Sequence, residues 1–221
     1  MPPGENPSRE RILERIRAGL RTPAPELPQE SSGGLIFEPI TNPLERFQQE
    51  CAANLIECVL TADAAASAQA LMNVIGSLPA GEIFVQEASS LRQLIGSSSL
   101  SSTSQRAIRW SSQGAPGEAS QATVTLAQAL IAQTGSIFVT SSCGGRGASV
   151  VAPCHVVFAT AAQLVPDLQT ALAHASRQGM VAHNSFACII SGSSRTGDIE
   201  KILVQGAHGP RRLVVILQQG M

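Results

Sequence analysis

Short apolar runs alternate with amphipathic stretches along most of the chain, and this alternation predicts an α/β protein. The apolar runs predict buried strands at 55–60, 82–86, 106–110, 137–140, 155–159, 186–190 and 212–217. Apolar positions at helical spacing predict helices at 43–54, 64–76, 89–95, 125–133, 166–177 and 196–203. Asp63 is the expected cap of the second helix, and Gly135 is expected to stop the fourth. Apolar strands that alternate with helices favour a layered α/β fold with a mainly parallel sheet.

The first 34 residues have a different pattern. One set of apolar residues recurs there at helical spacing among charged ones: Ile12, Leu13, Ile16 and Leu20. A short amphipathic helix is therefore expected at 8–20, with Ser8 as its N-cap, either packed on its own domain or docked on a partner chain. Prolines and glycines at 22–34 indicate a stiffened linker. The expected organisation is a helix with a Pro-rich linker (1–34) followed by one α/β domain (35–221).

Composition excludes several classes of protein. The 221-residue chain has a net charge of −1, and 3% of its residues are aromatic, with no Tyr. A nucleic-acid binder is expected to be basic, and base-stacking platforms need flat side chains, so neither is predicted. The hydrophobic content of 43% argues against a disordered chain. Since there is no long apolar run and no signal-peptide pattern, we expect no membrane span and a cytoplasmic location.

The cysteines do not indicate a metal centre. The chain has five of them, with no C-x-x-C pair: Cys51, Cys58, Cys143, Cys154 and Cys188. Zinc and iron–sulfur sites usually draw at least two ligands from one short turn. The cysteines are therefore expected to be small buried residues in a reducing compartment, and no metal or cofactor is expected on this chain.

The densest cluster of chemically active residue types lies at 191–210. A buried strand is expected to lead into a loop that opens a short helix, and this loop offers hydroxyls and one cation. Hydroxyl and amide donors at a helix N-terminus suit a carboxylate or a phosphate. Asp198 and Glu200 would repel such an anion, unless they cap the helix or pair with Arg195. A Ser-rich turn with ordinary helix-end chemistry is the alternative. His208, beside Gly209, is either a general acid/base or a side chain that stabilises the turn.

A second candidate is the glycine-rich loop at 140–149. Its glycines permit tight curvature, Arg146 supplies a cation, and His155 at the start of the next strand is expected to face the same crevice. Cys143 lies close to Arg146, but no partner base is identifiable from the sequence. The loop matches neither dinucleotide-binding nor P-loop fingerprints. Ligand sites are expected at the carboxyl ends of parallel strands, hence after Val139, Ala159 and Ile190.

Several segments together resemble one known family. The stretch S-G-S-S-R-T-G-D-I-E-K-I-L-V-Q-G-A-H-G-P-R-R-L-V-V-I-L (191–217) is similar to the signature of the lactate-utilization protein C family, or LUD domain. I-A-Q-T-G-S-I-F-V (131–139), V-A-P-C-H-V-V-F-A-T-A-A-Q-L-V-P-D-L (151–168) and the leading helix are also similar to it. Two positions depart from the pattern. Gln133 stands where the family commonly has an acidic residue, and Gly192-Ser193-Ser194-Arg195 stands in place of Gly-Pro-Ser-Arg.

The resemblance implies a three-layer α/β/α sandwich related to the NagB/RpiA/CoA-transferase-like superfamily. It also implies a non-redox subunit that helps to oxidise L-lactate to pyruvate, beside partner proteins that carry the iron–sulfur clusters. An anionic small molecule is the expected ligand. The candidate ligand-binding residues are Gly135, Arg146, His155, Ser191, Ser194, Arg195, Thr196, Asp198, Glu200, His208 and Gly209. Two alternatives remain: an independent enzyme or binding protein for a phosphorylated, CoA-linked or folate-like ligand, and an interaction module that docks through its leading helix.

Overall fold

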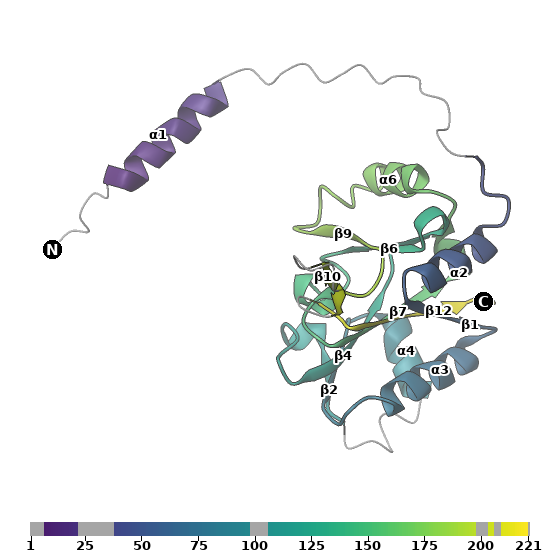
Figure 1. Cartoon of the computed structure of the whole chain (residues 1–221). Coiled ribbons are helices and arrows are strands. Elements are labelled where there is room, and N and C mark those ends of the chain that lie inside the picture. The colour runs from purple at the N-terminus through teal and green to yellow at the C-terminus, as the bar shows by residue number, and fades with distance from the viewer. Residues whose placement is uncertain (1–6, 22–37, 98–105, 198–202, 206–208, 221) are drawn as a thin grey trace. The chain divides into compact units, whose positions relative to one another are not determined.

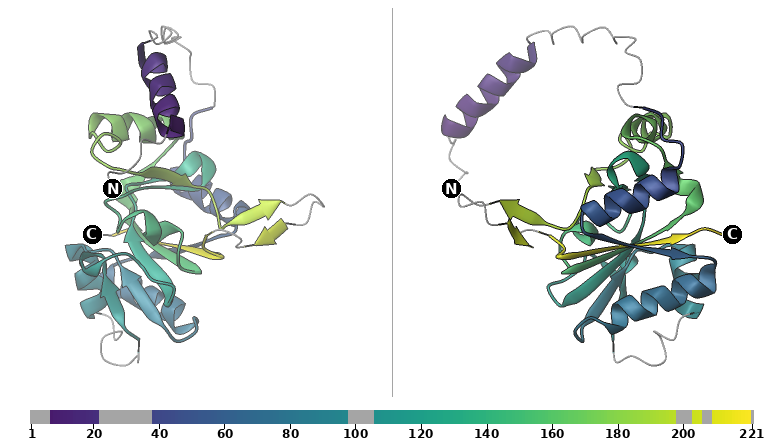
Figure 2. Two further views of the ribbon diagram at one scale, coloured as in Figure 1. Left: turned by 90° about the vertical axis from the view of Figure 1, so that its left-hand side faces the viewer. Right: turned by 45° about the vertical axis from the view of Figure 1, so that its right-hand side comes forward.

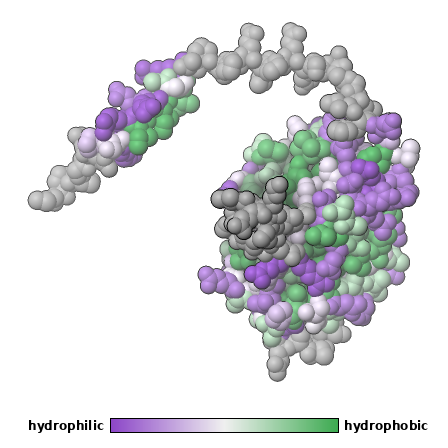
Figure 3. All heavy atoms as spheres, in the orientation of Figure 1, coloured by the Kyte–Doolittle hydropathy of each residue, from purple (hydrophilic) through white to green (hydrophobic). Residues whose placement is uncertain are grey.

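The computed structural model describes residues 7–21, 38–97, 106–197, 203–205 and 209–220 (Figure 1). The chain divides into two compact units, Met1–Glu38 and Pro39–Met221. Within the first unit, helix α1 (Pro7–Arg21) confirms the predicted amphipathic helix. It begins at Pro7, so Ser8 lies in its first turn rather than at the N-cap. Ile12, Ile16 and Leu20 are exposed and form an apolar stripe along the helix (Figure 3).

The second unit is built on a six-stranded sheet in which every neighbouring pair is parallel. Its order is β1-β12-β7-β4-β2-β3, which confirms the predicted parallel sheet. The strands are β1 (Ile56–Thr61), β2 (Glu82–Val85), β3 (Ile108–Trp110), β4 (Ser120–Leu126), β7 (Cys154–Thr160) and β12 (Arg212–Gln218). The central strands β12 and β7 are almost wholly buried, as expected for strands that are covered on both faces.

Two helices cover the first face of this sheet, namely α3 (Ala64–Gly76) and α4 (Ser89–Ser97). Asp63 caps α3 as predicted, because its Oδ1 accepts a hydrogen bond of 2.8 Å from the N–H of Ala66. Leu71 and Ile75 of α3 and Leu91 of α4 pack on alternate residues of the central strands. In the right-hand view of Figure 2 the sheet lies between α3 on this side and α2 on the other.

Helix α2 (Pro43–Ala53) and a second sheet cover the other face of the parallel sheet. The second sheet has the order β8-β5-β6-β9. Its strands are β5 (Ala129–Ile131), β6 (Ser136–Thr140), β8 (Leu164–Val165) and β9 (Ala187–Ile190). Helix α6 (Leu168–Arg177) packs on the outer side of this sheet through Ala171 and Ala175. The fold is thus α/β with layers on both faces of a parallel sheet, as predicted, but a small mixed sheet supplies part of one layer.

Two predicted helices are wrong. The segment at 125–133 forms the end of β4, strand β5 and a 3-10 turn (Ala132–Thr134). Most of this segment is buried between the two sheets, and a continuous apolar run does not distinguish a buried strand from a buried helix. The described ends of the segment at 196–203 instead belong to two antiparallel strands, β10 (Arg195–Gly197) and β11 (Leu203–Gln205), which we call the hairpin. This hairpin projects from the body of the second unit in both views of Figure 2.

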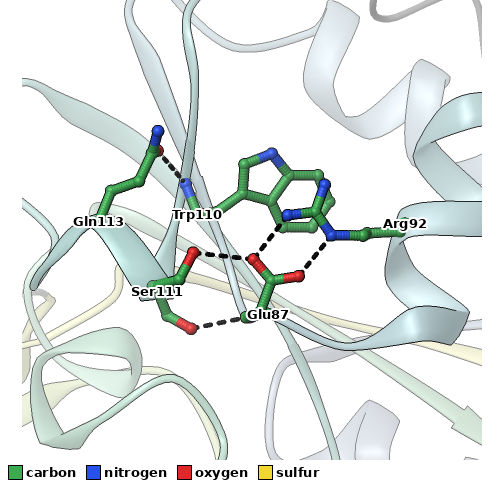
Figure 4. A network of polar contacts seen from close by, with 6 residues as sticks. Glu87, Arg92, Trp110, Ser111 and Gln113 are labelled. Atoms are coloured by element: carbon green, nitrogen blue, oxygen red, sulfur yellow. Dashed lines mark hydrogen bonds and ion pairs between the residues drawn. The ribbon is translucent and has the colours of Figure 1, made fainter.

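A polar network joins the carboxyl ends of β2 and β3 (Figure 4). Arg92 donates two hydrogen bonds to the carboxylate of Glu87, and its guanidinium lies 4.3 Å from the centre of the Trp110 ring. The N–H of Glu87 donates to Ser111 Oγ, and Ser112 Oγ donates to Glu87 Oε2, each over 2.8 Å. The hydrogen bonds from Arg92 lower the pKa of the Glu87 carboxyl. This cluster positions the edge strand by mutual contacts.

Arg92→Ala is expected to shift the emission of Trp110 to longer wavelength, because the guanidinium that covers the indole is removed. Trp110 is the only tryptophan in the chain, so fluorescence reports on this site alone. The melting temperature should fall by only about 2 °C, since exposed ion pairs stabilise weakly. Arg92→Lys is the matched control, which keeps the charge but loses the planar fork and should give an intermediate shift. Unchanged emission in Arg92→Ala would contradict the stacked arrangement.

Candidate functional site

A small hollow lies on the second face of the parallel sheet, beneath the glycine-rich loop (141–149). We call it the His155 hollow. Its lining consists of Thr125, Val139, Thr140, Cys143, Gly145, Ser149 and His155. β4 supplies Thr125, β7 supplies His155, and the loop that leaves β6 covers them. The structure therefore places His155, a candidate ligand-binding residue, beside the glycine-rich loop.

The His155 hollow is narrow and partly open in this structure. The space between its atoms, together with the solvent at its mouth, is about 160 Å³, and its walls are too close together to admit a water molecule. Sites for larger ligands usually span roughly 300–1,000 Å³. A ligand would therefore have to be small and would enter only if the loop moved.

His155 is the central polar group of the hollow. Its side chain is fully buried, and Nε2 lies 2.9 Å from Thr125 Oγ1. Burial lowers the pKa of His155 to about 4, so the imidazole is neutral near pH 7. Nδ1 has no hydrogen-bond partner among the described residues, and the same holds for the buried Oγ1 of Thr123. Thr123 is the cross-strand neighbour of His155, so two unpartnered polar groups come from adjacent strands.

Three amide side chains hold the first half of the glycine-rich loop. Gln86 Nε2 donates to the carbonyl of Ser142 over 3.1 Å, and Gln128 Nε2 donates to Ser142 Oγ over 3.1 Å. Asn184 Oδ1 accepts from the N–H of Ser142 at 3.0 Å and from Ser141 Oγ at 2.9 Å. These contacts come from three separate segments, so this half of the loop is rigidly attached to the domain.

Cys143 follows this anchored half and is buried in the wall of the hollow. Gln128 Nε2 lies 3.5 Å from its Sγ. The sequence identified no base for this thiol, whereas the structure places His155 in the same hollow. The thiol and the imidazole border the same narrow space, so a molecule in the hollow would lie against both of them.

The second half of the loop is held differently. Gly144 and Gly145 adopt φ values of 89° and 87°, which glycine tolerates better than any other residue. A 3-10 turn (Arg146–Ser149) follows, and its backbone bonds are mostly within the turn. The guanidinium of the exposed Arg146 lies 5.4 Å from the centre of the Phe186 ring. Within the described part of the chain, no carboxylate forms an ion pair with Arg146.

The C-terminal candidate residues gather at the base of the projecting hairpin. The N–H of Ser194 donates to the carbonyl of Pro210 over 2.9 Å, and a side chain at Gly209 would lie 3.2 Å from Ser194 Cβ. Ser193 is buried, and its Oγ has no partner among the described residues. Ser191 Oγ lies 2.6 Å from Ser136 Oγ, a contact between β6 and the segment after β9. Ser194 and Gly209 are therefore neighbours, although fifteen positions separate them in the sequence.

Ligand-binding loops were expected after Val139, Ala159 and Ile190, at the carboxyl ends of parallel strands. This prediction is wrong for the loops after Val139 and Ile190. Strands β6 and β9 belong to the second sheet, where they pair antiparallel, so only the loop after Ala159 leaves a strand of the parallel sheet. The N–H groups of Arg211 and Arg212 donate to the carbonyl of Pro153. The base of the hairpin therefore meets the amino ends of β7 and β12. The helix N-terminus expected to bind an anion there is replaced by strand β10.

The remaining candidates lie elsewhere or outside the described residues. Gly135 adopts φ 61° beside α2, and a Cβ at this position would lie 2.7 Å from the carbonyl carbon of Glu50. Gln133 Oε1 accepts from the N–H of Leu168 at 3.3 Å, at the start of α6. Arg195 and Thr196 are residues of strand β10. Asp198, Glu200 and His208 fall outside the described residues.

Most of the chain matches one protein family. A family model described as the LUD domain matches residues 44–218. The chain belongs to the LUD domain family. Two curated relatives match over 97 residues: lactate utilization protein C 1 of Bacillus mycoides (strain KBAB4) at 29% identity and lactate utilization protein C of Geobacillus sp. (strain WCH70) at 30%. Each match covers 42% of this chain, and 42% and 40% of the respective relatives, so the chain spans less than half of their length.

A solved structure shows the same fold. The crystal structure of a DUF162 family protein from Deinococcus radiodurans superposes with a TM-score of 0.60 at 17% sequence identity. The superposition covers 80% of this chain and 96% of that protein.

The whole His155 hollow lies within the LUD domain, as does the base of the hairpin. Sequence reasoning missed Thr123 and Thr125, because single threonines within an apolar strand carry no motif. It also missed the three amides that anchor the loop, which converge from distant segments. Among the described residues of this LUD domain protein, no three His, Cys, Asp or Glu side chains gather as metal ligands. None of its described helices is long and apolar enough to cross a membrane.

Proposed function

We propose that this LUD domain protein takes part in lactate utilization as a non-redox component. The observation that carries the proposal is the family match over residues 44–218, together with relatives named lactate utilization protein C. Oxidation of L-lactate to pyruvate releases two electrons and two protons. In the proposed system, iron–sulfur clusters on partner proteins accept the electrons, and this chain contributes the binding of an anionic small molecule.

The glycine-rich loop supports the binding part of this proposal. Arg146 is an exposed cation with no ion pair among the described residues, and no Asp or Glu lines the hollow beside it. Hydroxyl and imidazole groups of Thr125, Ser149 and His155 line the hollow, and Arg146 stands in sequence between the lining residues Gly145 and Ser149. A site that combines one cation with neutral donors favours an anion over a cation.

Reconstitution tests the proposed function. The chain and the proteins encoded beside its gene are purified, and lactate-dependent reduction of a dye is measured with and without this chain. The expected result is a stable complex and a rate at least several-fold higher when the chain is present. No complex and no gain in rate would overturn the proposal. The Arg177→Gln variant, altered at an exposed side chain of α6 that does not line the hollow, is the control that should keep the full gain.

A further inference from the structure

We propose that the His155 hollow is a binding site for a small monocarboxylate, a hydroxy or keto acid, that enters when the segment 145–149 lifts. The inference rests on the proposed function and names the ligand class and the place where it binds. It also assigns a part to Thr125, a buried residue that no sequence motif identified.

An unpartnered nitrogen on a residue that lines the hollow is the first observation. Buried polar atoms in folded proteins nearly always have a hydrogen-bond partner, and each exception calls for a cause. His155 Nδ1 lacks one among the described residues, although His155 is fully buried and lines the hollow. Its cross-strand neighbour Thr123, which lies outside the lining, has an unpartnered Oγ1 as well. A ligand oxygen that reached His155 would satisfy Nδ1.

The lining of the hollow selects the chemistry of the ligand. The polar groups are neutral donors and acceptors, namely Thr125, Thr140, Ser149 and His155, and no carboxylate is among the lining residues. Val139 supplies an apolar wall that suits a methyl group. Arg146 lies in sequence between Gly145 and Ser149, which both line the hollow, and it forms no ion pair among the described residues, so we assign it the carboxylate of the ligand. A short acid with one carboxylate, one further oxygen and one methyl group fits this set.

The size of the hollow excludes larger anions. About 160 Å³, with the solvent at its mouth included, is far below the space that a nucleotide or CoA derivative needs. Even a small acid requires movement, because the walls of the hollow leave no room for a water molecule in this structure.

The loop divides into a fixed and a movable half, which supplies that movement. Ser141 and Ser142 are held by the amides of Gln86, Gln128 and Asn184. Beyond them, Gly144 and Gly145 provide two glycines at positive φ, and the following turn bonds mainly to itself. Rotation at these two glycines lifts the segment 145–149 without breaking the amide contacts, but it exposes the buried Ala148 and releases the hydrogen bond from the N–H of Gly145 to the carbonyl of Ser141. Lifting also exposes Cys143, whose thiol is buried when the loop is closed.

The thiol of Cys143 therefore provides the test. The full chain is treated with iodoacetamide in the presence of L-lactate, pyruvate, acetate or inorganic phosphate, and alkylation of each cysteine is followed by mass spectrometry. At saturating L-lactate or pyruvate, alkylation of Cys143 should slow about tenfold, while the half-buried Cys58 and Cys188 keep their rates. Absence of protection by either acid would overturn the proposal. Protection by phosphate alone would also overturn it and favour a phosphorylated ligand.

Variants of two exposed arginines test whether Arg146 binds the ligand, and neither substitution is expected to destabilise the fold. Arg146→Gln should abolish the protection of Cys143 with an unchanged melting temperature, whereas Arg177→Gln on α6 should keep it, since both side chains are exposed. Equal protection in both variants would contradict the role of Arg146. A chain that raises the lactate-dependent rate of its partners but shows no protection refutes this inference and leaves the proposed function intact. Protection without any gain in rate supports the binding site and refutes the proposed function.

Discussion

Lowering the pH from 7 to 4 is expected to reduce the free energy of unfolding by about 3 kcal/mol through His155 alone. Burial lowers the pKa of His155 from 6.5 to about 4 in the folded protein. Between these two values the unfolded chain takes up a proton that the folded chain does not bind. The stabilisation is therefore fully present above pH 6.5 and is lost as the pH falls through about 4.

Urea denaturation at a series of pH values measures this effect, with His155→Gln as the comparison. Glutamine keeps a polar partner for Thr125 Oγ1 but does not titrate. Between pH 4 and 6.5 the wild-type free energy of unfolding should fall more steeply than that of the variant, whatever their difference at pH 7. Carboxylates titrate equally in both proteins, so their contribution cancels. Parallel curves would show that His155 is accessible to protons in the folded state, and hence that the hollow is open in solution.

The parallel sheet could be predicted because its strands carry their own signal. The runs at 155–159 and 212–217 are apolar at every position except their first residues, as a strand covered on both faces requires, and the structure pairs them along their full length. The role of Asp63 as a helix cap could also be predicted, because the hydrogen bond between its carboxylate and the first turn of α3 depends only on local geometry. These features are local, so a single sequence contains them.

The second sheet could not be predicted, because its strands are short and depend on distant partners. β5 has three residues and is buried on both sides, so its apolar run has the same pattern as a buried helix. The hairpin also depends on pairing between residues that are separated in sequence, because Arg195 of β10 lies opposite Gln205 of β11. Tertiary pairing therefore overrides the local preference for a helix at both places.

The candidate site was predictable only in part for the same reason. One short segment of the sequence contains the glycines of the loop, Arg146 and His155. Their association therefore follows from the single connection between β6 and β7. The partner of His155 is Thr125, thirty positions earlier, and its position depends on the register between β4 and β7. Register across a parallel sheet is not encoded near either residue. Gly135, one of the candidate ligand-binding residues, lies against the backbone of α2.

Gly135→Ala is expected to reduce the free energy of unfolding by about 3 kcal/mol. Gly135 adopts φ 61°, a left-handed conformation that costs an L-residue roughly 1–2 kcal/mol. An added Cβ would also lie 2.7 Å from the carbonyl carbon of Glu50 and 2.8 Å from the N of Cys51. Backbone atoms of a helix cannot rotate away, so α2 must shift, at a cost similar to overpacking a core. Urea denaturation measures the loss.

Gly179→Ala is the matched control, because it makes the same substitution at φ 63°. A Cβ there would meet only the ring of His183, an exposed side chain that can rotate away. Its expected loss is therefore about 1–2 kcal/mol, from the backbone conformation alone. Faster alkylation of Cys51, which is buried on α2 beside Gly135, should accompany the larger loss in Gly135→Ala and not in Gly179→Ala. Equal stability of the two variants would show that α2 moves aside freely. The difference between them thus measures how firmly the second face of the parallel sheet holds its covering helix.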